Sequence, residues 1–279
     1  MSKNRLVTRL VAPLAVFALN LAIAKAPAQT LGTRAQVTGG EIEGVASSVS
    51  GVTEFKGIPY AAPPVGPLRW QPPQPRAKWS GVLEADAFGP DCPSPREMPA
   101  SPQRHQIPTP VYKQSEDCLY MNIWTPAKTG TDNLPVMVWM MGGGFTSSSA
   151  RTLAVDGARL AAKGVLVVNF NNRVGVLGWL AHPALSAESK DHVSGNYGLM
   201  DIIAALRWVQ ANVAAFGGDP QRITIFGQSS GSMTTSIMTI TPWRGGCSKG
   251  RLGNPALHSA AISIRDSTPS PTPNRAETP

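Results

Sequence analysis

The residues best suited to chemistry lie in one stretch, Gly227-Gln228-Ser229-Ser230-Gly231, which fits the pattern G-x-S-x-G. The β-favouring residues 223–226 precede it, and the residues that follow begin a helix. A serine on a tight strand-to-helix turn exposes its hydroxyl, and the glycines two residues before and after it avoid collisions there. The next N–H, on Ser230, would face a developing oxyanion at the helix N-terminus. The pattern predicts a nucleophile elbow at Ser229.

A second glycine-rich stretch, Gly142-Gly143-Gly144, follows a predicted apolar strand at residues 136–140. Three glycines let the backbone approach a reacting carbonyl and turn consecutive N–H groups toward it. A merely flexible loop is the alternative interpretation. The elbow further along the chain favours an oxyanion loop, in which each donor would be worth roughly 2.7–4 kcal/mol in the transition state.

The segments around these stretches predict how they are positioned. Residues 136–140, 165–170 and 223–226 are continuous apolar runs, as strands covered on both faces require. A short helix is expected at 156–163 and a long amphipathic helix from 201 to 213. A hairpin at 37–44 and a proline-rich segment come earlier in the chain. The alternation of strands and helices predicts a doubly wound α/β fold with a mostly parallel sheet.

The net charge of +8 arises mainly at the two ends of the chain. Between residues 29 and 241 there are 16 Lys and Arg residues against 15 Asp and Glu. Nucleic-acid binding based on the high isoelectric point is therefore not expected. The sequence shows no metal-ligand cluster, phosphate-binding loop or cofactor fingerprint, so no metal and no cofactor are predicted.

Residues 1–28 have the features of a signal peptide: a basic start, an apolar run and a cleavage site at Ala26-Pro27-Ala28. A transmembrane anchor is the alternative, but Pro13 and Asn20 interrupt a run that is already short for spanning. We expect a secreted protein, extracellular or periplasmic, with no stable membrane insertion once the leader is removed. The folded domain is expected at 29–241.

The chain has three cysteines, Cys92, Cys118 and Cys247. Export favours pairing of cysteines. Cys92 and Cys118 flank a proline-rich segment, and a bridge between them would contribute about 3–4 kcal/mol. Cys247 would then be left over, which is unusual in a secreted chain.

From about Val37 to Thr241 the chain resembles the type-B carboxylesterase family, which includes the cholinesterases, within the α/β-hydrolase fold. The resemblance rests on six motifs in one order, at residues 55–69, 116–120, 142–145, 196–201, 216–220 and 227–231. So many landmarks in one order make it very specific.

The resemblance implies a serine hydrolase of small-molecule carboxylic esters in which Ser229 forms the acyl-enzyme. It also implies an oxyanion hole made by the N–H groups of Gly143, Gly144 and Ser230, and a Cys92–Cys118 disulfide around a loop at the mouth of the site. A non-catalytic relative used for binding or adhesion is the alternative. Ser229 and the glycine triplet argue against it, because such relatives commonly lose the serine.

Length is the main departure from the family, whose members are much longer and carry the triad Glu and His downstream of the serine. The histidines of this chain are His105, His182, His192 and His258, and none matches the family's catalytic histidine. A serine without its base is a weak nucleophile. Loss of one core triad member can cost about 10⁶ in rate, so we expect the chain as given to be inactive or very weak.

The character of the sequence changes after Thr241. Apolar periodicity ends, and residues 267–273 alternate Pro with Ser and Thr, which predicts a disordered tail over 242–279. A natural tail or linker is one interpretation. A frameshift near residue 241 is the other, because residues 242–248 can be encoded so that a frame two bases on reads L-A-R-G-L-F, which is family-like. The domain would then be C-terminally truncated.

Overall fold

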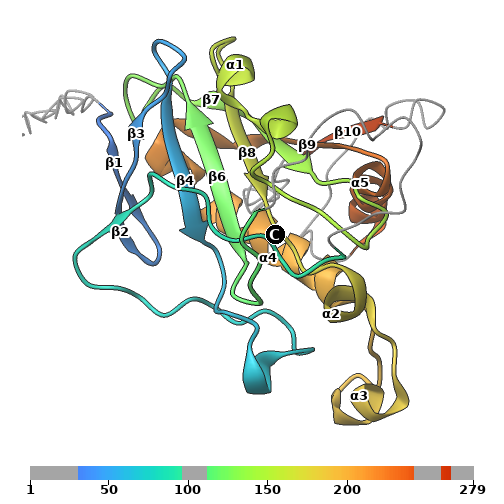
Figure 1. Cartoon of the computed structure of the whole chain (residues 1–279). Coiled ribbons are helices and arrows are strands. Elements are labelled where there is room, and N and C mark those ends of the chain that lie inside the picture. Colours follow the sequence, from blue (N-terminus) through green and yellow to red (C-terminus); the bar gives the residue numbers. More distant parts are fainter. Residues whose placement is uncertain (1–30, 96–111, 242–258, 265–279) are drawn as a thin grey trace, which may run out of the picture.

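A mixed sheet of seven strands forms the centre of the computed structural model, which describes residues 31–95, 112–241 and the backbone of 259–264 (Figure 1). The spatial order of its strands is β10–β9–β7–β8–β6–β4–β3. Their bounds are β3 Val45–Ala46, β4 Thr53–Pro59, β6 Tyr120–Thr125, β7 Leu134–Met140, β8 Leu166–Phe170, β9 Gly218–Gln228 and β10 Ser259–Ile264. A second sheet joins β1 (Arg34–Val37), β2 (Gly40–Glu43) and β5 (Val82–Glu84).

The sheet is parallel only at its centre. β8, β7 and β9 run parallel, whereas β3, β4, β6 and β8 pair antiparallel, as do β9 and β10. The α/β-hydrolase fold is as predicted, but the prediction of a mostly parallel sheet needs correction for the described residues. Parallel neighbours require a crossover connection, usually a helix. Between β3 and β6 the described chain contains no α-helix. In the central sheet, the strands of this stretch, β3, β4 and β6, pair antiparallel.

Helices cover both faces of the central strands. Successive strand residues point to opposite faces. Ile123 and Val168 belong to the core cluster that also contains residues of α4 (Tyr197–Asn212), whereas their neighbours Trp124 and Val167 pack with α1 (Ala158–Ala161). The long helix and the short helix therefore lie on opposite faces of the sheet. Figure 1 shows α4 passing behind the strands.

This arrangement creates a topological switch point. From β7 the chain passes through α1 to β8 on one side, and from β8 it returns through α4 to β9 on the other side of β7. Ligands in open α/β sheets bind where the carboxyl ends of such strands separate. The ends of β7 and β9 lie side by side, since Met140 pairs with Gly227. The loop after β7 and the turn after β9 must therefore meet.

The remaining helices are α2 (Gly175–Trp179), α3 (Pro183–Glu188) and α5 (Ser230–Ile240), with short 3-10 turns at Gly66–Leu68, Leu153–Val155 and Val213–Phe216. The stretch Tyr197–Phe216 is long and apolar enough to cross a membrane by length and composition. Half of that stretch is buried inside the protein, and core helices of water-soluble proteins commonly share these properties.

Part of the predicted disordered tail forms a strand. Residues 259–264 pair antiparallel with β9, from Ser259 opposite Gln228 to Ile264 opposite Ile223. The short apolar run Ala260-Ala261-Ile262 suits a strand, so the expectation of disorder does not hold for these six residues. The rest of the tail, with Cys247, and the predicted leader at 1–28 lie outside the described residues.

Candidate active site

Ser229 occupies a strained turn between β9 and α5. Its φ of 57° and ψ of −128° lie outside the ordinary regions for a residue with a side chain. Such strain persists only where the surroundings enforce it. They do so here, because a Cβ on Gly227 would lie 2.7 Å from the carbonyl of Gly231 and one on Gly231 would lie 2.1 Å from the Met140 oxygen. The predicted elbow geometry is present, and both glycines are required by backbone contacts.

The glycine loop lies directly against this elbow. A Cβ on Gly142 would be 2.7 Å from the Gln228 carbonyl oxygen and 3.4 Å from the Ser229 Cβ. Gly143 and Gly144 follow with φ of 124° and 63°, and Gly143 accepts hydrogen bonds from the N–H groups of Thr146 and Ser147, both at 3.1 Å. The structure therefore brings together the two stretches that the sequence singled out.

Three backbone N–H groups near Ser229 are unpaired within the part of the chain that the structure describes. Within residues 31–95 and 112–241, those of Gly143, Gly144 and Ser230 have no hydrogen-bond acceptor, and the Ser229 hydroxyl also has none. Ser230 is the first residue of α5, where N–H groups have no intrahelical partner. Unpaired donors beside a half-buried serine hydroxyl suit the stabilisation of an oxyanion.

A short helix that the sequence did not reveal supports the glycine loop. The N–H of Gly175, at the start of α2, donates to the carbonyl of Phe145 at 2.7 Å. The ring of Phe145 packs against Trp179 at the other end of α2, with centroids 4.7 Å apart. Phe145 has a φ of 63°, so this contact holds it in a conformation rare for an aromatic residue. Neither end of α2 has a sequence signal strong enough to predict the helix.

Comparison with known proteins agrees with this geometry. Residues 32–260 match the carboxylesterase family. The chain belongs to that family. The match starts before Val37 and ends after Thr241, so it extends beyond both limits expected from the motifs alone.

Among relatives of this carboxylesterase-family chain are a fumonisin B1 esterase of Sphingopyxis macrogoltabida, 49% identical over 203 residues, and a para-nitrobenzyl esterase of Bacillus subtilis, 42% identical over 204 residues. Each alignment covers 73% of this chain but only 36% and 39% of the relative. The solved structure of a PNB esterase superposes with a TM-score of 0.68 at 40% identity, covering 77% of this chain and 42% of its own. The matched part of the chain thus covers well under half the length of these relatives.

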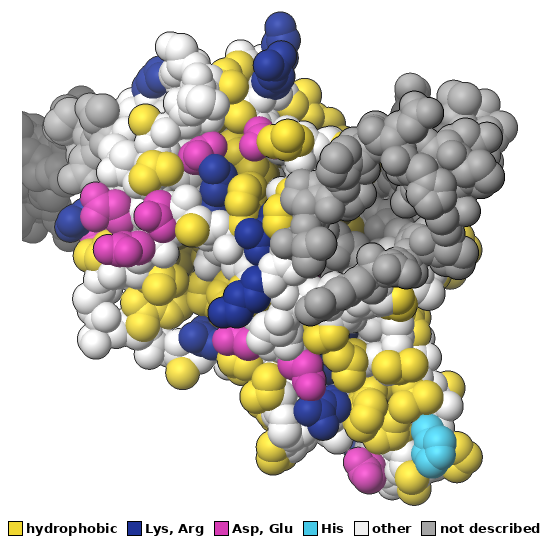
Figure 2. Space-filling view, in the orientation of Figure 1, with side chains coloured by type: hydrophobic (Ala, Val, Ile, Leu, Met, Phe, Trp, Pro, Cys, Tyr) yellow, Lys and Arg dark blue, Asp and Glu magenta, His cyan; other side chains and the backbone are white. Residues whose placement is uncertain are grey.

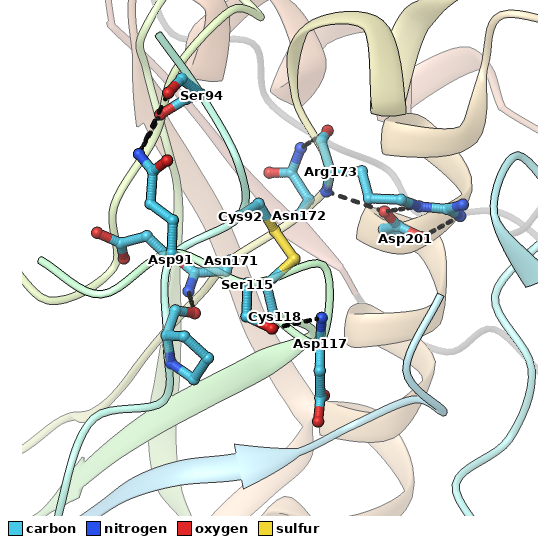
Figure 3. The surroundings of a disulfide bond; sticks show 12 residues. Asp91, Cys92, Ser94, Ser115, Asp117, Cys118, Asn171, Asn172, Arg173 and Asp201 are labelled. Carbon is cyan, nitrogen blue, oxygen red and sulfur yellow. Dashed lines mark hydrogen bonds and ion pairs between the residues drawn. A yellow bond between two sulfur atoms is a disulfide. The ribbon is translucent and has the colours of Figure 1, made fainter. Parts of the chain in front are cut away.

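The predicted disulfide is present. Cys92 and Cys118 are bonded, with 5.0 Å between their Cα atoms, and both are buried (Figure 3). The bridge lies beside the segment of Asn171, Asn172 and Arg173 that follows β8. It joins the two ends of the loop that the family resemblance places at the mouth of the site.

The base of this disulfide loop is fixed to the chain that follows the glycine loop. Asp91 accepts a hydrogen bond from the Ser149 hydroxyl at 2.9 Å, and Asn171 donates to the Pro90 carbonyl at 3.0 Å. Burial raises the pKa of the Asp91 carboxyl, and the Ser149 hydroxyl and the charge of Arg151 oppose that rise. These contacts fix Pro90 and Asp91, just before Cys92, to the segments that follow the glycine loop and β8.

A buried ion pair braces the same region. The Arg173 guanidinium donates to both carboxylate oxygens of Asp201 at 2.8 Å, and the Arg173 N–H donates at 3.0 Å (Figure 3). Both side chains are almost completely buried. Burial raises the pKa of Asp201, and the hydrogen bonds and charge of Arg173 oppose the rise. The pair joins the end of β8 to α4.

Glu116 forms a second ion pair, with Arg69. Its two oxygens accept hydrogen bonds from Arg69 at 2.6 and 2.7 Å. The neighbouring Asp117 interacts with Tyr120, and burial together with that carboxylate raises the pKa of Tyr120 to about 12. Glu116 is thus an ion-pair partner of Arg69.

No histidine of the described residues adjoins Ser229. His182 caps α3, where its Nδ1 accepts from the Ala184 N–H at 3.2 Å, and His192 is exposed in the turn that follows. α3 projects from the body of the molecule well away from α5 (Figure 1), and on the face shown in Figure 2 histidine is visible only on that projection. His105 and His258 lie outside the described residues.

Proposed function

We propose that this chain carries the nucleophile and oxyanion hole of a serine carboxylic-ester hydrolase. The Ser229 hydroxyl would attack the ester carbonyl, the bond to the alcohol would break, and an acyl-enzyme on Ser229 would form before water releases the acid. The N–H groups of Gly143, Gly144 and Ser230 would donate to the oxyanion of each tetrahedral intermediate. The observation that carries this proposal is the contact of Gly142 with Gln228 and Ser229.

A complete reaction also needs a base for the Ser229 proton and an acid for the leaving alcohol. The described residues supply no histidine at Ser229, since His182 and His192 belong to the α3 projection. We therefore expect slow acylation by this chain alone. An oxyanion hole and substrate binding without the triad still give roughly 10³–10⁴ over water.

The substrate is proposed only at the level of a small-molecule carboxylic ester. The relatives' names refer to chemically different esters, those of fumonisin B1, para-nitrobenzyl, pyrethroid and cocaine. These relatives are all named as esterases or hydrolases, but their names agree on no single acid or alcohol. The Cys92–Cys118 disulfide supports the expected export of the protein.

An organophosphonate probe tests the proposal. The folded chain would be incubated with a fluorophosphonate, digested, and examined by peptide mass spectrometry. The expected result is labelling at Ser229 ahead of every other serine, abolished in Ser229→Ala but preserved in Ser236→Ala on the exposed side of α5. Labelling spread evenly over the surface serines would reject the proposal. It would favour the alternative of a non-catalytic binding domain that keeps the fold.

A further inference from the structure

A basic groove lies against α4, and none of the residues that line it belongs to the glycine loop or to the elbow. It has a volume of about 470 Å³ and runs between the proline-rich segment 73–79 and the second half of α4, ending at Asn212. α4 leads into β9, so Asn212 lies near the amino end of that strand, whereas Ser229 follows its carboxyl end. β9 has 11 residues, so the Asn212 end of the groove and Ser229 are separated by on the order of 30 Å. The groove is therefore distinct from the candidate active site.

Three cationic side chains line this groove, Arg76, Lys78 and Arg207, and all three are exposed. None of the residues that line it is Asp or Glu. Among the described residues, none of the three cations forms an ion pair within 4.0 Å of a carboxylate. The charge of Arg76 lowers the pKa of Tyr120, which also interacts with the Asp117 carboxylate, so Arg76 has a negative charge in its surroundings. Lys78 and Arg207 are therefore the two cations whose charge is less compensated by acidic groups.

The walls of the groove are held in place without a ligand. The Trp79 indole N–H donates to the Glu41 carbonyl at 2.8 Å, and its ring fills the space that a Cβ on Gly39 would need. At the other wall, the Thr38 N–H donates to the Asn212 side chain at 2.7 Å. A preformed concave site loses little conformational entropy on binding.

The groove and its charges indicate the ligand class. Guanidinium groups recognise carboxylates and phosphates through paired hydrogen bonds. The volume is within the usual range of roughly 300–1,000 Å³ for small-molecule sites. A nucleic acid would need a longer basic surface, and residues 29–241 are nearly neutral overall.

We propose that this groove binds a small organic anion carrying two or three carboxylate or phosphate groups. Arg207 on α4 and Lys78 on the proline-rich segment would contact different anionic groups of one ligand. Trp79 and Trp208 also line the groove. Binding there is independent of the proposed chemistry at Ser229.

Isothermal titration calorimetry of the full chain at low salt tests this site, with citrate as the tricarboxylate probe and pyrophosphate as the phosphate probe. Saturable binding of either probe supports the proposal, and the tighter one identifies the preferred anionic group. Arg207→Glu is expected to weaken binding at least about tenfold. Arg207→Lys is expected to weaken it less, because lysine keeps the positive charge but cannot make the paired hydrogen bonds of a guanidinium. Ser229→Ala is expected to bind like the wild type.

The matched control is Arg159→Glu, which makes the same charge change at an exposed position on α1, on the other face of the sheet. It is expected to leave affinity within about twofold, since distant exposed charges are screened. Equal losses in the two Glu variants would mean that net charge, not the groove, attracts the anion, and would overturn the proposal. Absence of binding of both probes up to about 10 mM would do the same.

Discussion

The Cα of Gly231 faces the carbonyl oxygen of Met140 so closely that a Cβ on that glycine would lie 2.1 Å from the oxygen. Met140 ends β7, and Gly231 lies in the first turn of α5. The same oxygen would lie 2.8 Å from a Cβ on Gly227. The first turn of α5 is thus pressed against the strand that carries the glycine loop, and this contact holds Ser229 beside that loop.

Gly231→Ala should therefore destabilise the chain. Its methyl group overlaps backbone, which cannot rotate away as a side chain can, and overpacking of this kind costs about 1–3 kcal/mol or more. Chemical denaturation would measure the loss. Gly130→Ala is the matched control, because a Cβ there meets nothing within 4 Å. Equal stabilities of the two variants would show that the elbow is looser than the structure indicates.

Gly142→Ala should impair the reactivity of Ser229 more than it impairs folding. Its Cβ would lie 2.7 Å from the Gln228 carbonyl and 2.9 Å from the Gln228 side chain, so the loop must move away from the elbow. Displacing one oxyanion donor costs about 10²–10³ in rate. The rate of fluorophosphonate labelling at Ser229 would measure this. Gly32→Ala, at an open position, should label at the wild-type rate.

The features that could be predicted from the sequence are those with local signals. The elbow needs glycines at Gly227 and Gly231, and the glycine loop is a glycine run after an apolar strand, so each signal appears within a few residues. The central strands could be predicted because both of their faces are covered. Their apolar runs are therefore continuous.

The features that could not be predicted depend on partners far apart in the chain. Arg173 and Asp201 are separated by 28 residues, and nothing in either segment indicates that they meet. The antiparallel pairing of β6 with β8 and of β10 with β9 likewise depends on the tertiary arrangement. α2 has five residues, too few for a periodic pattern, and is held by contacts with Phe145.

Removing the disulfide should lower stability by about 3–4 kcal/mol. Cys92 and Cys118 close a loop with a sequence separation of 26, and cross-linking it reduces the entropy of the unfolded chain. The double variant Cys92→Ser, Cys118→Ser would be compared with the wild type by denaturation, with and without reductant. Cys247→Ser is the control, and it should behave like the wild type in oxidising buffer. A wild-type stability that does not respond to reductant would contradict the prediction.

Asp201→Asn should cost far more stability than the same change at Asp219. Asp201 is completely buried, and its loss leaves the Arg173 charge in the interior without a counter-charge, which costs about 3–5 kcal/mol. Asp219 pairs with Arg222 at the surface, where an ion pair is worth about 0–1 kcal/mol. Denaturation midpoints of the two variants would test this difference. Similar values would mean that water reaches the Arg173 site.

The Asp91→Asn variant should gain stability relative to the wild type as pH rises. Burial raises the pKa of Asp91 in the folded state, so folding favours its protonated form. That contribution is fully present below the unfolded pKa and is lost as pH rises through the folded pKa. Asn cannot ionise, but its side-chain oxygen can still accept the Ser149 hydrogen bond.

Unfolding free energies at about pH 4 and about pH 7 would measure this change. Glu84→Gln, at an exposed position, controls for the removal of one negative charge. The difference between Asp91→Asn and the wild type should move in favour of the variant between the two pH values. Movement in the opposite direction would mean that attraction to Arg151 outweighs the burial of the carboxylate.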